Sequence, residues 1–411
     1  MTPEQISKLD AGDEFADKRH LFSLPEDIIY LNGNSLGPLP IRAAQRLDQV
    51  TNQQWGEDLI SSWNKHSWID LPVTAGEKIA PLLGAASGQV ICCDSISLNL
   101  FKLLAGSLQL RPDRFRVLSQ TDNFPTDLYV AQGLQQLLGT SRCQLDMVAP
   151  DQLCDALSKE VAVLLLSHVN FRDGYIHDMA EMTRLAHQQG ALVIWDLAHS
   201  AGVLPLELDE WNVDFAVGCG YKFLNGGPGA PAFIYVNSRH HGKFSQPLLG
   251  WMGHKAPFDF DTDFLPAEGV GQFMTGTPPI LSLVALDAAL DTFADIDLHK
   301  LREKSIALTE CFLQLVEKQP ALADLQLRSP RKVERRGSQL SFAHPEAYGI
   351  CRAWADAGVI ADFRSPDLFR IGFSPLILSF EEIAQAVHAL AEVMRNKTYA
   401  EAKYQQRLKV T

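Results

Sequence analysis

The sequence predicts an α/β protein, with a large domain built on a mostly parallel sheet with helices on both faces and a smaller C-terminal α+β domain. Between about residues 71 and 280, a short apolar run, a loop and a helical segment follow one another repeatedly. After Pro278 and Pro279 long helical stretches replace this pattern. The length of 411 residues also favours two domains over a single core. The predicted strands are residues 116–119, 162–167, 192–195, 213–217 and 232–236.

The first seventy residues show little alternation of strand and helix. They contain a turn-rich stretch from Asn32 to Pro38, which follows the short apolar run at residues 28–31. We therefore expect three parts in the chain. These are an arm at residues 1–70 that wraps the main domain or a partner subunit, a large domain at residues 71–280 and a small domain at residues 281–411.

Several helices have recognisable end signals. Asp178 and Glu181 have the spacing of a capping box, and Gly190 ends that helix just before the run at residues 192–195. Ser95 is placed as the N-cap of an apolar helix. In the small domain we expect helices at residues 281–295, 298–318 and near 381–395, with strands at residues 339–342 and 369–373.

Composition excludes several classes of function. The net charge is −13, from 36 Lys plus Arg against 49 Asp plus Glu, so a nucleic-acid partner is not expected. No apolar segment reaches the roughly 20 residues of a membrane span, and the N-terminus lacks a signal-peptide pattern, which predicts a cytoplasmic protein. The seven cysteines show no C-x-x-C pair, so neither a metal site nor a disulfide framework is predicted.

Lys222 is the residue that most needs a chemical explanation. It follows the predicted strand at residues 213–217 and precedes a glycine-rich turn, where a lysine is unfavourable unless its amine is bonded or its charge is answered. Asp196 ends the preceding strand, at the same edge of the predicted sheet. A lysine for an aldehyde and an acid for a pyridinium nitrogen are what a pyridoxal phosphate enzyme requires. Each residue alone also fits a solvent-exposed lysine or a helix-capping aspartate.

Further positions fit the same cofactor. The start of the helix after Ser95 offers backbone N–H groups and hydroxyls for a phosphate, although it also fits a simple N-cap. Phe124 follows the strand at residues 116–119 and could lie flat against a ring, although most phenylalanines at such positions are core residues. The turn at residues 226–229 lacks the G-x-G-x-x-G order, which argues against a nicotinamide site.

An arginine interrupts an apolar strand of the small domain. Arg370 lies within the run at residues 368–373, where a surface arginine would fit poorly. A guanidinium group offers two parallel donors to a carboxylate. We therefore predict that Arg370 binds the α-carboxylate of an amino-acid substrate.

Nearly the whole chain resembles the kynureninases, which are fold-type I pyridoxal phosphate enzymes related to class V aminotransferases. The WDLAHSAG and YKFLNGGPG segments together make the resemblance specific. The segments that carry it are residues 31–37 (LNGNSLG), 123–127 (NFPTD), 167–169 (SHV), 195–202 (WDLAHSAG), 221–229 (YKFLNGGPG) and 276–279 (GTPP).

The resemblance implies an activity. Kynureninases hydrolyse the Cβ–Cγ bond of L-kynurenine to give anthranilate and L-alanine, or act in the same way on 3-hydroxykynurenine, in tryptophan catabolism and the kynurenine pathway that serves NAD biosynthesis. The cofactor is pyridoxal 5'-phosphate. Trp63 together with Thr277 resembles the bacterial pattern, which favours the unsubstituted substrate.

The resemblance also assigns site residues. Lys222 would carry the cofactor, Asp196 would pair with its ring nitrogen, and His199 would lie beside it. Tyr221 would bind the phosphate, act as a second acid/base, or do both. The other implied residues are Ile96, Ser97, Asp127 and Ser167 in the pocket, Phe124 on the ring, Trp251 and Thr277 at the phosphate, and Trp63 at the aromatic end of the substrate. Because Trp251 and Thr277 would come from the other subunit, a homodimer is implied.

Three other functions fit parts of the pattern. A class V aminotransferase shares the fold and is not excluded by motifs. A cysteine desulfurase would need a reactive cysteine on a mobile loop and usually a histidine before the cofactor lysine, where this chain has Tyr221. A non-catalytic scaffold would have no use for a lysine, an acid and an arginine in one crevice.

Overall fold

A computed structural model describes residues 1–408. Its centre is a seven-stranded sheet with the strand order β4-β10-β9-β8-β7-β5-β6. β10 runs antiparallel to both of its neighbours, and the other pairs are parallel, which confirms a mostly parallel sheet. The strands are β4 (Val90–Cys92), β5 (Arg116–Gln120), β6 (Gln144–Val148), β7 (Val161–Ser167), β8 (Leu192–Asp196), β9 (Phe215–Cys219) and β10 (Ala232–Val236).

One predicted strand is displaced and two were not predicted. The run expected at residues 213–217 forms β9 two residues later, because the Val213 amide donates to the Leu208 carbonyl in a turn. Asp214 directly precedes β9, and side chains from other parts of the chain fix its carboxylate. The unpredicted strands are β4, which is three residues long, and the edge strand β6, whose side chains are mostly half-buried.

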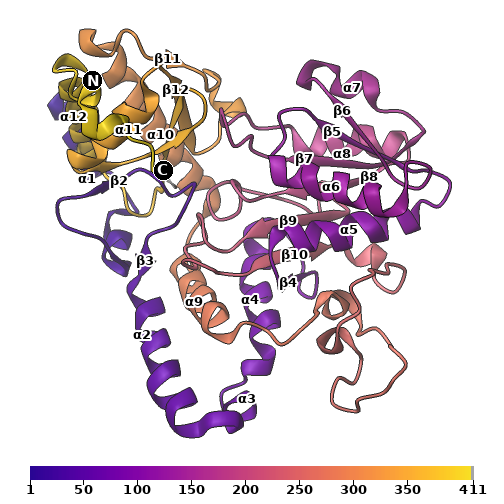
Figure 1. The fold of residues 1–411 in the computed structure, drawn as a ribbon. Coiled ribbons are helices and arrows are strands. Elements are labelled where there is room, and N and C mark those ends of the chain that lie inside the picture. Colours follow the sequence, from indigo (N-terminus) through magenta and orange to yellow (C-terminus); the bar gives the residue numbers. More distant parts are fainter. Residues whose placement is uncertain (409–411) are drawn as a thin grey trace.

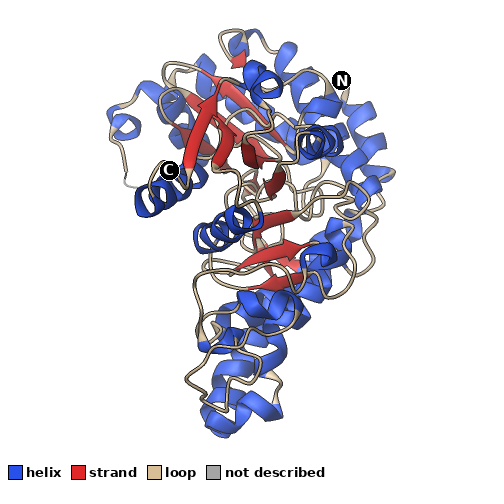
Figure 2. Cartoon of the chain, turned by 90° about the vertical axis from the view of Figure 1, so that its right-hand side faces the viewer, coloured by secondary structure: helices blue, strands red, loops and turns tan. Residues whose placement is uncertain are grey.

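Helices cover both faces of this sheet, as Figures 1 and 2 show. Alternate side chains of each strand enter different apolar cores, as expected for a sheet buried on both faces. On one face lie α5 (Ile96–Leu110) and α6 (Pro125–Leu138). On the other lie α4 (Leu71–Ile79), α8 (Met179–Gln188) and α9 (Ile280–Leu290). Asp178 caps α8 through the Glu181 amide, as predicted.

The C-terminal region has a sheet of its own. It is antiparallel with the order β11-β12-β15-β14, and it is packed against three helices at the upper left of Figure 1. The strands are β11 (Gln326–Leu327), β12 (Gln339–Ala343), β14 (Asp362–Arg364) and β15 (Leu368–Gly372). The helices are α10 (Leu298–Glu317), α11 (Ala347–Asp356) and α12 (Phe380–Arg395), and a short α13 (Ala402–Gln405) follows them.

The N-terminal seventy residues contact distant parts of the chain. α1 (Pro3–Ala11) packs against α12, and β2 (Ile29–Tyr30) pairs with β13 (Val359–Ile360). β1 (Phe22–Ser23) and β3 (Leu39–Pro40) pair with each other. α2 (Ile41–Gln49) packs against α9, then a π-helical segment at Val50–Asp58 leads to α3 (Ser62–Lys65). α2 and α3 project from the bottom of the molecule in Figure 1. The division at residues 70 and 280 stays a prediction.

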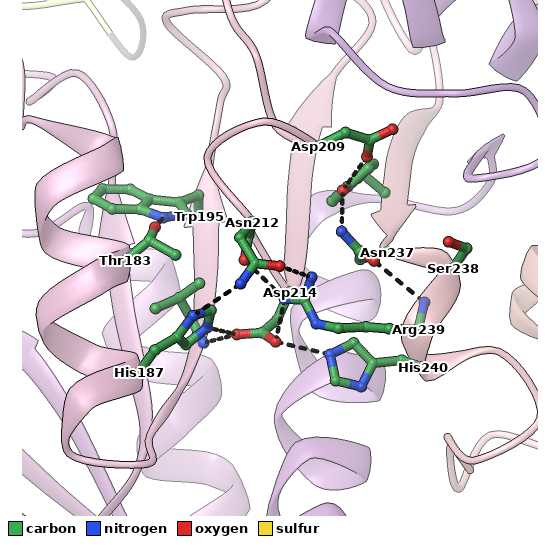
Figure 3. A network of polar contacts seen from close by, with 12 residues as sticks. Thr183, His187, Trp195, Asp209, Asn212, Asp214, Asn237, Ser238, Arg239 and His240 are labelled. Carbon is green, nitrogen blue, oxygen red and sulfur yellow. Dashed lines mark hydrogen bonds and ion pairs between the residues drawn. The ribbon is translucent and has the colours of Figure 1, made fainter.

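A buried carboxylate fixes the start of β9 (Figure 3). Asp214 is 2% exposed and accepts hydrogen bonds from the Val193 amide and Arg239, and it pairs with His187 and His240. Burial alone would raise the pKa of Asp214, but the contacts with the two histidines and the charge of Arg239 hold it below its usual range. Asp214 thereby holds together β8, β9 and the segment after β10, at the amino ends of the parallel strands β8 and β9.

No helix within residues 1–408 is both long and apolar enough to cross a membrane. The same residues contain no group of three His, Cys, Asp or Glu side chains placed to hold a metal ion.

Candidate active site

A cavity of about 300 Å³ lies at the carboxyl ends of the parallel strands. Ser167, Asp196 and Cys219, which are the last residues of β7, β8 and β9, face into it, and Ala232 closes it from the start of antiparallel β10. Eight predicted site residues line this one cavity: Ile96, Ser97, Phe124, Ser167, Asp196, His199, Tyr221 and Lys222.

Register places two polar side chains next to each other. Ser167 and Asp196 are directly paired in the β7–β8 ladder, so parallel pairing brings them to the same level of the sheet. The Ser167 hydroxyl donates to Asn123 Oδ1 at 2.6 Å, and Asp196 Oδ1 accepts from the Ala198 amide at 2.7 Å. Both groups are therefore held by the loops that follow the strands.

Asp127 forms a buried acid pair with Asp196. Asp127 is fully buried on α6, and its Oδ2 lies 3.5 Å from the Ser167 hydroxyl. Burial, then the charge of Asp196, holds the pKa of Asp127 well above its usual range. Burial also raises the pKa of Asp196, while the charge of Lys222 opposes that shift. Each carboxyl group disfavours ionisation of the other, and the larger upward shift at Asp127 means that Asp127 keeps a proton more readily than Asp196.

One oxygen of this pair has no partner. Asp127 Oδ1 is buried without a hydrogen bond from any described residue. A buried acceptor without a donor is costly, and such atoms often mark the place of a ligand. A pyridine ring with a protonated nitrogen supplies the cationic donor that this acid pair lacks, so the residues present fit the predicted cofactor.

Lys222 lines the cavity from a tight turn. The Asn225 amide donates to the Lys222 carbonyl at 2.9 Å, with Asn225 in the left-handed region at a φ of 59°. Gly37 packs so close that an added Cβ would lie 2.3 Å from that carbonyl oxygen. The Lys222 amine lies 5.9 Å from the ring centre of Phe124 and 5.8 Å from that of Tyr221. Among the described residues it has no ion-pair partner, which keeps its amine available.

His199 and Tyr221 are both neutral at neutral pH. Burial, then the positive charges of Lys222 and Arg370, holds the pKa of His199 well below its usual range. Gln339 Oε1 contacts His199 Nδ1 at 2.8 Å, which links the cavity to strand β12 of the C-terminal sheet. Burial, then the proximity of Cys219 and Asp196, raises the pKa of Tyr221 above its usual value. Tyr221 therefore carries a phenolic proton that it can donate.

Aromatic and helix-end groups complete the walls. Phe124 precedes α6, is 37% exposed and meets Phe171 edge-to-face at a centroid distance of 5.3 Å. Ser95 caps α5 by accepting from the Leu98 amide, as predicted. The first residues of α5, Ile96 and Ser97, therefore present free N–H groups toward the cavity.

Arg370 lies behind the cavity wall. It is 1% exposed, and its Nε and Nη2 donate to the two oxygens of Asp362 at 2.8 and 2.6 Å. Its Nη2 also donates to the Ser35 hydroxyl at 3.1 Å, and its Nη1 donates at 2.5 Å to the carbonyl of Phe171, a cavity-lining residue. The guanidinium is thus fixed in direction next to the cavity rather than within its lining.

The three remaining predicted residues gather elsewhere. Trp63, Trp251 and Thr277 line a second cavity of about 610 Å³. Trp251 stacks with Phe260 and meets Phe258 edge-to-face, and both phenylalanines are largely exposed. The other lining residues are Ile60, Asn64, Ile69, Met252 and Phe258. Within one chain these residues are therefore not part of the Lys222 cavity.

Some site residues were missed by the sequence analysis. Thr126, Val169 and Phe171 line the Lys222 cavity, and each lies within a few residues of a predicted one. That proximity is a usable signal. Gln339 and Asp362 hold His199 and Arg370 from other strands, and no local pattern reveals such pairings.

Known proteins resemble this chain in both sequence and structure. Residues 301–390 match a family model described as the kynureninase C-terminal domain. Kynureninase of Pseudomonas fluorescens is 44% identical over 407 residues, which cover 98% of each chain. Kynureninase of Burkholderia pseudomallei strain 1106a is 46% identical over 414 residues and 100% of each chain.

The solved structures that match share the fold at low identity. The apo cysteine desulfurase of Thermococcus onnurineus NA1 is 18% identical with a TM-score of 0.78, covering 92% of this chain and 98% of that one. A mutant of C-DES with glycine covalently linked to its pyridoxal phosphate has the same identity and TM-score, covering 91% and 99%. These structures support the predicted fold alone. The full-length identity to curated relatives decides the family, and this chain belongs to the kynureninases.

Proposed function

We propose that this chain is a pyridoxal 5'-phosphate-dependent hydrolase that cleaves the Cβ–Cγ bond of L-kynurenine to give anthranilate and L-alanine. 3-Hydroxykynurenine is the second candidate substrate. The observation that carries the proposal is the Lys222 cavity, where an unpaired amine faces a buried acid pair in a chain of the kynureninase family. When bound, pyridoxal phosphate supplies an electron sink for charge that develops at the substrate Cα.

The residues divide the work of holding the cofactor. Lys222 would hold the aldehyde end of the cofactor, and its amine would then be the base that moves a proton at the substrate Cα. Asp196, with Asp127 held protonated behind it, keeps a proton on the ring nitrogen. Phe124 would pack on the ring, and the start of α5 at Ile96 and Ser97, which also lines the cavity, would hold the phosphate.

The remaining side chains act on the substrate. Arg370, already oriented by Asp362, offers an N–H group toward the α-carboxylate beside Phe171. Tyr221 is protonated and adjacent to Lys222, so it can give a proton to the departing fragment or bind the phosphate. His199 stays neutral and adds no second positive charge beside Lys222.

We also propose that the enzyme is a cytoplasmic homodimer. Trp251 and Thr277 lie outside the Lys222 cavity of their own chain, and Trp251 is 41% exposed. Exposed aromatic side chains of this size are typical of surfaces that another protein covers. In the dimer, Trp251 and Thr277 would complete the phosphate end of the partner's cavity, and Trp63 would contact the aromatic end of the substrate.

The test is one cuvette experiment on the purified protein. Its absorbance spectrum is recorded before and after L-kynurenine is added, while anthranilate is followed by fluorescence. A visible band for protein-bound pyridoxal phosphate together with rising anthranilate supports the proposal. A band without anthranilate contradicts the reaction and redirects the work to keto-acid-dependent amino transfer and to desulfuration. The absence of any band contradicts the cofactor assignment.

A further inference from the structure

Lys102 is a charged residue with no exposed surface. It lies on α5, about two helical turns beyond the N-cap Ser95, and its side chain is 0% exposed. Its amine contacts the carboxylate of Asp94, the Phe273 carbonyl at 2.5 Å and Asn99 Oδ1 at 3.4 Å. A buried ammonium group is costly unless its charge and its three donors are all answered, as they are here. None of the proposed catalytic roles uses this group.

Asp94, the partner of Lys102, begins the segment at residues 94–97, which we call the phosphate loop because the proposed function places the cofactor phosphate there. It connects β4 to α5 and directly precedes Ser95, Ile96 and Ser97, which line the Lys222 cavity. Its backbone is in the left-handed region with a φ of 48°, which is unusual for a residue other than glycine. The surrounding contacts therefore hold the loop in this conformation, and the Lys102 ammonium group is the one among them that carries a full opposite charge.

Thr275 attaches a second segment to the same carboxylate. Its hydroxyl lies 3.1 and 3.3 Å from the two oxygens of Asp94. Its carbonyl accepts from the Met252 amide at 3.1 Å, and an added Cβ on Gly250 would lie 2.2 Å from the Thr275 carbonyl oxygen. Thr275 thus packs against the backbone on either side of Trp251 and lies two residues before Thr277.

The Asp94 carboxylate therefore joins the walls of two different cavities. On one side it sets the phosphate loop of the Lys222 cavity, and on the other it holds the Trp251 and Thr277 wall of the second cavity. Both connections are buried or nearly so, with Asp94 itself 18% exposed. Displacing either wall must strain the other, since one ion pair supports both.

We propose that Asp94 and Lys102 are positioning residues that couple the two cofactor sites of the dimer. This coupling rests on the proposed function, because the wall formed by Trp251 and Thr277 closes the partner's site only in a homodimer. Each chain then fixes, through one buried ion pair, both its own phosphate loop and the wall that it gives to the other chain. Pyridoxal phosphate bound in one site stabilises the wall that completes the second.

The first test is Thr275→Val, which removes the hydroxyl contact to Asp94 and preserves side-chain shape. We expect the dissociation constant of pyridoxal phosphate, measured by absorbance titration of the cofactor-free protein, to rise about five- to tenfold, the size of one ordinary hydrogen bond, because Thr275 acts on the cofactor only through Asp94. Thr74→Val is the matched control, because the Thr74 hydroxyl bonds only locally to the Leu71 carbonyl. Asp94→Asn, which keeps the shape and removes the charge, should weaken binding further, and it should also lower the melting temperature of the cofactor-free protein because it leaves the buried Lys102 ammonium group without a counter-charge. Thr275→Val, which leaves the ion pair intact, is therefore the decisive variant.

Heterodimers decide whether the two sites are coupled. Lys222→Ala in one subunit silences the absorbance band of that site, so the band reports only the other site. In one arrangement Thr275→Val is placed in the reporting subunit, and in the other it is placed in the silent subunit. The proposal requires weaker cofactor binding in both arrangements.

Other outcomes overturn the proposal. An effect in only one arrangement would mean that the pair serves one site and couples nothing. Unchanged binding in both arrangements would remove Thr275 and Asp94 from the cofactor site altogether. The variant Trp251→Ala distinguishes failure of the coupling from failure of the dimer proposal. If Trp251→Ala weakens the binding of pyridoxal phosphate and Thr275→Val does not, only the coupling fails. If Trp251→Ala has no effect, the cross-subunit contact itself is wrong.

Discussion

The two cavities of this chain are built from different material. Around Lys222 one wall is formed by strand ends, and its residues Ser167, Asp196 and Cys219 are each at most 9% exposed. Around Trp251 the walls are loops and short helices, with Ile60 and Phe258 80% and 59% exposed. Strands paired on both sides fix their last side chains within a single chain. Loop aromatics of this exposure are typical of a surface that another chain completes.

Substitutions in the two cavities should therefore have different effects on catalysis and cofactor binding. Changes in the Lys222 cavity should affect chemistry and substrate binding without a contribution from the partner. Changes at Trp251 and Thr277 in the second cavity should affect retention of the cofactor, because we propose that these residues act on the phosphate end of the partner's site.

The largest effect is expected from Lys222→Ala. Loss of the amine that bonds to the cofactor and moves the Cα proton should abolish the visible band and reduce turnover by about 10³-fold or more. Absorbance and anthranilate fluorescence measure the two losses. Lys243→Ala, on an exposed loop, is the control and should change neither. Retained turnover in the Lys222 variant would contradict the assignment of the cofactor lysine.

Arg370→Lys should weaken substrate binding. Lysine keeps the charge but cannot reproduce the fork that pairs with Asp362 and leaves a donor for the substrate carboxylate. We expect KM for L-kynurenine to rise about tenfold, with kcat within about threefold, from the loss of one charged hydrogen bond. Arg331→Lys, at an exposed ion pair with Glu317, is the matched control. An unchanged KM would exclude Arg370 from carboxylate binding.

Trp251→Ala tests the second cavity. The proposed contact with the partner's phosphate end predicts that the dissociation constant of pyridoxal phosphate rises about fivefold, the size of one modest polar or packing contact. Equilibrium dialysis of the cofactor measures it, and Tyr129→Ala, an exposed aromatic on α6, serves as the control. Equal affinities of variant and wild type would show that the two cavities do not meet across subunits.

The smallest effect on activity is expected for His177→Gln, because His177 is buried outside the lining of the Lys222 cavity, with its Nε2 3.0 Å from Gln120 Oε1. Burial, then the charge of Arg335, lowers the pKa of His177 from 6.5 to about 4. Between these values the unfolded chain binds a proton that the folded chain does not, so stability falls as pH drops from about 6.5 to 4. In the His177→Gln variant, the free energy of unfolding should therefore fall by about 3 kcal/mol less than in the wild type over this pH range.

Urea unfolding of the cofactor-bound protein at several pH values measures this difference. His388→Gln, an exposed position on α12, should leave the pH dependence as it is in the wild type. Parallel stability curves for wild type and His177→Gln between pH 6.5 and 4 would show that His177 is not a buried neutral histidine.

Much of the fold could be predicted because its signals are local. Apolar runs of strand length predicted β5, β7, β8 and β10, and an N-cap aspartate with a terminal glycine predicted α8. β4 and β6 were missed because one is three residues long and the other lies half-exposed at an edge. β9 begins two residues late because the Val213 amide is used in a turn with Leu208, and because tertiary contacts of Asp214, which no sequence window contains, fix the approach to the strand.

The sequence by itself determined the fold class, the residues at the strand ends and the lysine among them, since strand length, spacing and residue type are properties of short segments. Only the tertiary structure decided that burial beside Asp196 raises the pKa of Asp127, that Asp362 orients Arg370, and that Trp63, Trp251 and Thr277 lie apart from Lys222. Those facts depend on distances between side chains from separate elements. Such distances set electrostatic and hydrogen-bond energies, and chain folding alone fixes them.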